Sequence, residues 1–151
     1  MTPAAADDLV IQVHDVMKLV LRRLHPNLEA EGISMGQFWA LHLVSSLESA
    51  SLSTIARHLS VSAPTLCVSV DQLEASGLLT RQRSTRDRRA VELALTGRGR
   101  KVEARIWARM GLLMAEVAAD LPSDDLATTV RVFRELRHRL EASEDCQGGH
   151  P

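Results

Sequence analysis

The feature that most constrains the fold is a change of apolar period between Leu52 and Leu95. Two stretches with helical spacing come first, separated by a short turn around Val61; their apolar members are Leu52, Ile55, Ala56 and Leu59, then Leu66, Val70 and Leu73. Two stretches with the two-residue period of a strand, "LLTRQR" and "AVELAL", follow at once. A short helix pair followed by a β-hairpin predicts a winged helix-turn-helix.

Local signals mark the ends of these elements. Ser62 is suited to cap the second helix, Pro64 is tolerated in its first turn, and Gly77 fits the position just after its end. In the second strand, one face is predicted to carry Val91, Leu93 and Leu95.

Helical spacing also covers the chain before this region. We predict an amphipathic helix from Asp8 to about His25, which Pro26 would end or kink. Ser34 and Gln37 have the form of a capping box, which opens a further helix through "GQFWALHLV".

After the hairpin, a long helix is predicted to follow Gly97 and to keep its apolar period as far as Leu121. Pro122 interrupts it, and Ser123 is placed to cap a last helix that carries Leu126, Val130, Phe133, Leu136 and Leu140. The predicted fold class is mainly α with a small β-hairpin.

The formal net charge of −1 conceals a segregation of charge. Between Ser53 and Lys101 there are nine Lys and Arg against four Asp and Glu, whereas the rest of the chain has nine against fifteen. Five of these arginines lie between Thr80 and Arg89. A basic block between acidic segments favours binding of a polyanion, although an arginine cluster can also be a merely solvated surface.

Duplex DNA suits this arrangement. The second helix would enter a major groove, with a DNA-facing surface made of Ser62, Ala63, Pro64, Thr65, Val68, Ser69 and Gln72. No Lys or Arg lies between Ser62 and Leu73, so base reading must depend on hydroxyl, amide and apolar contacts. The hairpin tip would reach an adjacent minor groove and its phosphates with Arg83, Arg86, Asp87, Arg88 and Arg89.

The sequence gives little support for a membrane, secreted, metal-binding or catalytic protein. No apolar segment reaches the roughly 18 residues of a membrane span, and no secretion signal is visible, so we expect a cytoplasmic protein without a membrane partner. Two cysteines cannot form a disulfide framework, and the six histidines lack metal-site spacing. No catalytic arrangement or phosphate loop is recognisable, so we expect neither an enzyme, nor a cofactor, nor a metal.

Beyond these patterns, the chain resembles the MarR family of bacterial transcriptional regulators over roughly Leu9 to Leu140. The most specific stretches are "LEASGLLTR" and "DRRAVELALTGRG". The resemblance implies that Asp87 orients Arg89 in the wing. It also implies a homodimeric, ligand-responsive repressor that reads a palindromic operator.

The same resemblance predicts one domain over residues 1–151. Residues 34–100 would form the winged helix-turn-helix part, 8–30 and 101–142 the dimerisation helices, and 143–151 a tail. A crevice between these parts would bind a small aromatic or amphipathic effector through Met17, Leu21, Trp39, His42 and Met110.

Three alternatives remain open from the sequence. The effector-site residues could be ordinary core, because apolar residues at helical spacing are core by default. The winged helix could serve a protein partner instead of DNA. Cys67 could sense oxidants, although no Lys, Arg or His lies close to it in the sequence and a small filler side chain fits equally well.

Overall fold

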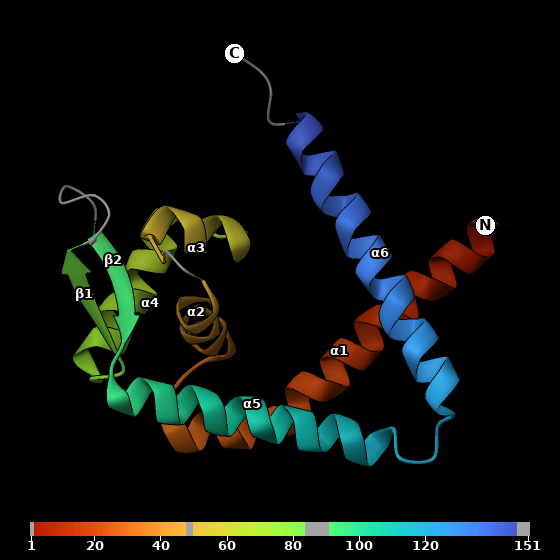
Figure 1. The fold of residues 1–151 in the computed structure, drawn as a ribbon, viewed down its shortest axis with the longest axis horizontal. Helices are drawn as coiled ribbons and strands as arrows, with labels where there is room; N and C mark the ends of the chain where they lie inside the picture. The colour runs from red at the N-terminus through yellow and green to blue at the C-terminus, as the bar shows by residue number, and fades with distance from the viewer. Residues whose placement is uncertain (1, 48–49, 84–90, 148–151) are drawn as a thin grey trace. The chain divides into compact units, whose positions relative to one another are not determined.

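The computed structural model describes residues 2–47, 50–83 and 91–147, with no account of side chains after 143. Figure 1 shows a mainly helical chain with one antiparallel hairpin, as the sequence predicts. The elements are α1 (Pro3–Glu31), α2 (Met35–Ser46), α3 (Leu52–His58), α4 (Ala63–Ala75), β1 (Leu79–Arg83), β2 (Val91–Leu95), α5 (Gly97–Val117) and α6 (Ser123–Gln147).

The chain divides into two compact units, Met1–Leu112 and Leu113–Pro151. Within the described residues, no helix combines the length and apolar character that a membrane crossing requires. The proposed division into a DNA-binding part, dimerisation helices and a tail stays a prediction.

Of the two outcomes expected at Pro26, an end or a kink, the ending is wrong. α1 is one helix from Pro3 to Glu31, although proline lacks the N–H that an interior turn would use. Leu24 and Leu28 are buried on either side of Pro26, and their packing holds the helix past it. The helix ends instead at Gly32, whose φ of 68° is left-handed and whose N–H donates to Leu28 and Glu29 carbonyls.

Two other boundaries differ from prediction. α5 ends at Val117, before Leu121, and α6 continues through Gln147 into the residues predicted as a frayed tail. Helix ends are fixed by local capping and packing, which the apolar period does not report.

The core lies in one region, which we call the lobe and define as residues 28–106. Its centre is made of side chains that are 2% exposed or less, and they come from α2, α3, α4, the start of the hairpin and α5: Phe38, Leu41, Ile55, Leu66, Val70, Leu73, Leu78, Leu79, Val102 and Ile106. The predicted apolar stripes of α3 and α4 therefore pack into a single core, which fixes the exposed face of α4.

Candidate nucleic-acid interface

The turn between α3 and α4 sets where α4 begins. Ser60 has a left-handed φ of 52°, and the Val61 N–H donates to the Ala56 carbonyl at 3.1 Å. Ser62 then caps α4 as predicted, because its Oγ accepts from the Thr65 N–H at 3.3 Å. The Ser62 and Thr65 hydroxyls also lie 2.7 Å apart, so each is held in a defined orientation.

The face of α4 opposite the core brings together the residues predicted to meet DNA. Leu66, Val70 and Leu73 are buried, while the first turn is exposed and Val68 is 58% exposed. Ser69 is half-buried, and its Oγ donates to the Thr65 carbonyl at 3.4 Å. The exposed face thus offers methyl groups and small hydroxyls, as predicted, without a cation.

Gln72, at the far end of this face, is held by a contact that the sequence did not reveal. Gln37 Nε2 donates to Gln72 Oε1 at 2.7 Å, while Gln37 Oε1 accepts from the Ser34 N–H at 2.8 Å. The predicted capping box is therefore present, and its second half also reaches α4. Because the Gln72 oxygen is engaged by Gln37, its amino group is the part best placed to donate outward.

The hairpin is anchored at its base. β1 pairs with β2 from Leu79–Leu95 to Arg83–Val91, and the Leu93 N–H donates to the Ala50 carbonyl at 2.9 Å. The predicted shared face of β2 holds only in part. Leu93 and Leu95 are buried, but Val91 is 48% exposed because it lies at the end of the hairpin far from the core.

Of the predicted wing residues, Arg83 ends β1 and is exposed. The four others, Arg86, Asp87, Arg88 and Arg89, lie outside the described residues. Their contacts, and the orientation of Arg89 by Asp87, stay predictions.

Arg81, the first arginine of the cluster, contacts α4 instead of projecting freely. Its Nη2 lies 2.5 Å from Asp71 Oδ1, its Nη1 contacts Glu74, and its backbone N–H donates to Glu74 Oε1 at 3.2 Å. The hydrogen bond to Asp71, together with the charges of both carboxylates, raises the pKa of Arg81. Its role in the structure is to join the wing to α4, which composition alone could not show.

The junction after the wing is also closely fitted. Thr96 Oγ1 donates to the Gly77 carbonyl at 2.7 Å and accepts from the Gly99 N–H at 3.0 Å. A Cβ atom on Gly99 would lie 1.9 Å from the Leu78 carbonyl oxygen, so only glycine fits there without a backbone shift. The end of α4, the wing and the start of α5 are thereby held in one geometry.

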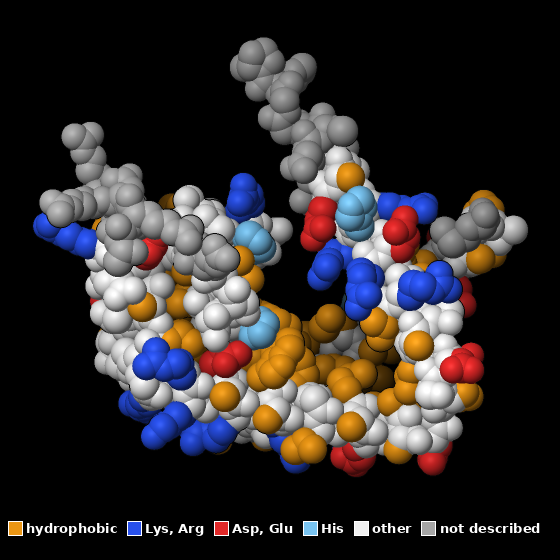
Figure 2. Space-filling model, in the orientation of Figure 1, with side chains coloured by type: hydrophobic (Ala, Val, Ile, Leu, Met, Phe, Trp, Pro, Cys, Tyr) orange, Lys and Arg blue, Asp and Glu red, His pale blue; other side chains and the backbone are white. Residues whose placement is uncertain are grey.

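The residues predicted for an effector site are brought together only in part. His42 stacks on Trp107 with ring centroids 4.1 Å apart, Trp39 meets the same ring edge-on at 6.4 Å, and His42 Nδ1 lies 2.8 Å from Glu103 Oε1. We call these four residues the aromatic cluster; hydrophobic side chains gather on the surface of α5 beside α2 in Figure 2. Trp107 and Glu103 were not among the predicted site residues.

The remaining three predicted effector residues divide between two places. Met110 packs partly buried against the core, whereas Met17 and Leu21 line a hollow of about 490 Å³ along α1. Cys67 is half-buried and forms no disulfide. In the part of the chain that the structure describes, no group of three His, Cys, Asp or Glu could hold a metal ion.

Comparison with known proteins gives a family match in the region that holds α2, α3, α4 and β1. Residues 33–91 match the MarR family. The repressor MdtR of Bacillus subtilis is 23% identical over 144 residues, which are 93% of each chain. A MarR family protein from Bacillus stearothermophilus has a TM-score of 0.82 at 18% identity, covering 93% of this chain and 99% of that one.

A second solved structure agrees with the first. The Staphylococcus aureus MarR, in complex with salicylate and kanamycin, has a TM-score of 0.82 at 20% identity, covering 93% of this chain and 95% of that one. At such identities, the two structures establish the fold.

Proposed function

We propose that this chain, a MarR family transcriptional regulator, binds duplex DNA as a homodimer and represses transcription until a small effector binds. The observation that carries the DNA proposal is the exposed face of α4, whose opposite face is buried in the core, together with the exposed Arg83 at the end of β1. The role needs no catalysis, and in a bacterium it would be exercised in the cytoplasm, where the DNA lies.

In this proposal the two parts of the interface have different tasks. α4 lies in the major groove, where Thr65 and Ser69 offer hydroxyls and Val68 offers methyl groups that suit the thymine methyl. Arg83, with Arg86, Arg88 and Arg89, binds the minor groove and its phosphates. Because α4 has no cation between Ser62 and Leu73, the wing supplies most of the salt-dependent affinity.

Dimerisation is supported by apolar side chains that the described chain leaves exposed. They lie on three separate segments that we call the arms: residues 3–20 of α1, 111–117 of α5 and all of α6. They include Val10, Ile11, Val16, Leu112, Val117, Val130, Phe133 and Leu140, each 45% exposed or more. Apolar surface of this extent marks a protein interface. A symmetric pair would present two α4 helices to half-sites about 34 Å apart.

The aromatic cluster is our candidate for the effector site. Two indole rings and an imidazole with a carboxylate partner offer stacking surfaces and a polar anchor to a small aromatic compound. Binding there would alter the packing of α2 on α5, and thereby the spacing of the two α4 helices. A shift of a few ångströms over that spacing is enough to break the match to both half-sites.

The test is selection of bound fragments from the parent genome, followed by fluorescence anisotropy of the full chain on the selected duplex. We expect a palindromic site, a steep fall of affinity with salt, and release by an aromatic metabolite. An unrelated duplex of the same length is the control. Binding of a protein partner in place of DNA is the alternative, because α4 has no Lys or Arg between Ser62 and Leu73. Absence of binding to every duplex at low salt would favour this alternative.

A further inference from the structure

The side-chain amide of Gln72 on α4 has a defined orientation, which a backbone group of another segment sets. The Ser34 N–H can only donate, so the Gln37 atom that lies 2.8 Å from it is the carbonyl oxygen, Oε1. The other end of the Gln37 amide, Nε2, can only donate in turn, so the Gln72 atom 2.7 Å from it is also a carbonyl oxygen. The polarity of one backbone group therefore decides which way both amides point.

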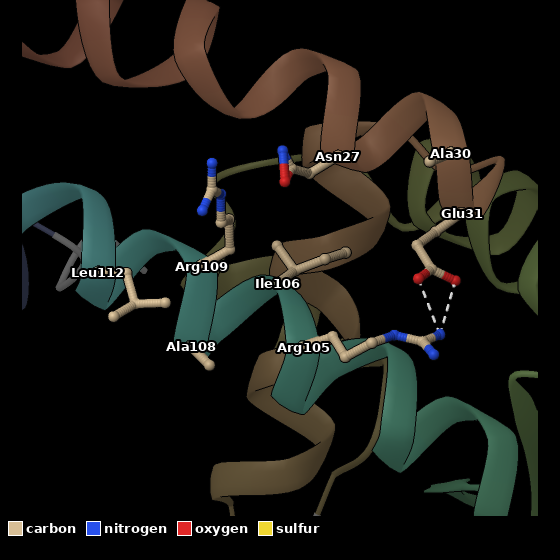
Figure 3. A pocket seen from close by; sticks show the side chains of 8 residues that line it. All are labelled: Asn27, Ala30, Glu31, Arg105, Ile106, Ala108, Arg109 and Leu112. Atoms are coloured by element: carbon tan, nitrogen blue, oxygen red, sulfur yellow. Dashed lines mark hydrogen bonds and ion pairs between the residues drawn. The ribbon is translucent and has the colours of Figure 1, made fainter.

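The backbone that carries this N–H is itself held in place. Glu31, at the end of α1, pairs with Arg105 of α5, and Figure 3 shows the pair, in which Oε1 lies 2.8 Å from Nη2. Ile33 is buried, and its N–H donates to the Leu28 carbonyl at 3.1 Å. Ser34 follows directly and caps α2, so its N–H occupies a defined position in the lobe.

The amino group of Gln72 is the free end of this relay. Gln72 is exposed, and it lies on the face of α4 that carries Val68 and Ser69. Its Nε2 forms no hydrogen bond within the part of the chain that the structure describes. The oxygen and the amino group of an amide point in different directions, so an oxygen turned toward Gln37 leaves the amino group pointing away from it. Gln72 therefore presents donors, and not an acceptor, to whatever lies against this face.

A side chain that only donates distinguishes between bases. A glutamine with both ends free suits adenine, which has an acceptor at N7 beside a donor at N6. Guanine has acceptors at both N7 and O6, which match an amino group whose own oxygen is engaged elsewhere. We propose that Gln37 is a positioning residue, which restricts Gln72 to guanine at one base pair of each half-site. This inference rests on the proposed function, since it names a base that α4 reads.

The first test uses the duplex selected with the full chain, in fluorescence anisotropy. Each base pair of a half-site is replaced in turn, and the wild type is compared with Gln72→Ala. The position read by Gln72 is the one at which this variant loses its preference. We expect guanine there, bound at least about tenfold more tightly than any other base. A preference for adenine or thymine at this position, or no such position, would overturn the inference.

The second test reverses the polarity of the relay through Gln37→Glu. A glutamate keeps the capping box with Ser34, so the variant should fold, but both of its oxygens can only accept. Gln72 must then turn its amino group toward α2 and its oxygen toward the DNA. The preferred base should change from guanine to cytosine, whose N4 is a donor. Gln37→Met removes the relay without adding charge, and should let adenine bind within about twofold of guanine.

The matched control repeats Gln37→Glu in a chain that carries Gln72→Ala. Only the added charge acts there, so affinity should fall equally for all four bases. A guanine preference that survives both Gln37 variants, or a change to cytosine without Gln72, would overturn the inference while leaving the proposed function intact. Failure of the wild type to bind any duplex would instead contradict both. Circular dichroism checks the folding of each variant, and Gln72→Ala, at an exposed helical position, tests the guanine preference even if a Gln37 variant does not fold.

Discussion

Apolar side chains are buried in the lobe, whereas those of α6 are largely exposed. In the lobe, Ile55, Leu66 and Leu73 are 2% exposed or less. On α6, at the same helical spacing, Phe133 is 45% exposed and Leu140 is 66% exposed. The pattern in the sequence is similar, but only the lobe finds its packing partners within the described chain. Apolar periodicity therefore says which face is to be buried, and not whether the chain itself buries it.

The largest expected effect is on dimerisation, through the exposed apolar residues of α6. Val130 and Phe133 are three residues apart and share a face of α6. Changing both to Asp should weaken the proposed dimer by at least about 4 kcal/mol, or roughly a thousandfold, since each change occurs in both copies. Light scattering at micromolar concentration should then report a monomer.

The matched control is in the lobe. Val68→Asp also places a charge on an exposed apolar residue, at 58% exposure, but on the DNA-facing side of α4. It should leave the dimer intact and weaken DNA binding. A double α6 variant that stays dimeric would show that α6 is not part of the interface.

The next effect concerns packing within the lobe. Gly99→Ala places a Cβ 1.9 Å from the Leu78 carbonyl oxygen, so the wing and α5 must separate. We expect a loss of about 2–3 kcal/mol in the free energy of unfolding, measured by urea denaturation.

Gly111, on the arm part of the same helix, gives the opposite expectation. Its Cβ would meet nothing within 4 Å, so Gly111→Ala should stabilise α5 by about 0.5–1 kcal/mol. Equal effects of the two changes would mean that the close fit at Gly99 does not hold the lobe together.

Sequence reasoning succeeded in the lobe where the signals are local. The caps at Ser34 and Ser62 and the buried stripe of α4 follow from residue types within a few positions of one another. Pro26 shows the limit of such rules, because packing of Leu24 and Leu28 outweighs the lost hydrogen bond. Local preference decides only where tertiary contacts do not oppose it.

The candidate sites were harder to predict because their contacts join distant positions. Gln37 and Gln72 lie 35 residues apart in the chain, and His42 and Glu103 lie 61 apart. Arg81 was counted in the basic cluster but not among the DNA-facing residues, and its pairing with α4 was not predicted because it depends on how the hairpin folds back. Which residues are charged was readable from the sequence; which charges are already compensated was not.

Two ion pairs, one between the wing and α4 and one on α6, should differ in their effect on DNA affinity. Arg81→Ala removes the link between wing and α4 and exposes the carboxylates of Asp71 and Glu74 near the DNA. We expect DNA affinity to fall about tenfold, or roughly 1.4 kcal/mol, in anisotropy titrations. Adding Asp71→Asn and Glu74→Gln should recover part of the loss if the charges are responsible.

The control pair lies on α6, where Arg139 Nε is 2.6 Å from Glu135 Oε1 and its hydrogen bond lowers the pKa of that carboxyl. Both side chains are well exposed, so Arg139→Ala should change neither stability nor DNA affinity measurably. If it weakened DNA binding as much as Arg81→Ala, the position of Arg81 beside α4 would not be the cause.

The smallest effect compares two exposed arginines that have no partner among the described residues. Arg83 ends β1 in the lobe, and Arg131 lies on α6. If the wing contacts phosphate, Arg83→Ala should reduce the slope of log affinity against log salt by about one, while Arg131→Ala leaves the slope unchanged. Titrations between low and moderate salt measure both. Equal slopes in the two variants would mean that charge on the wing acts only through the overall field of the protein, and that Arg83 does not touch the DNA.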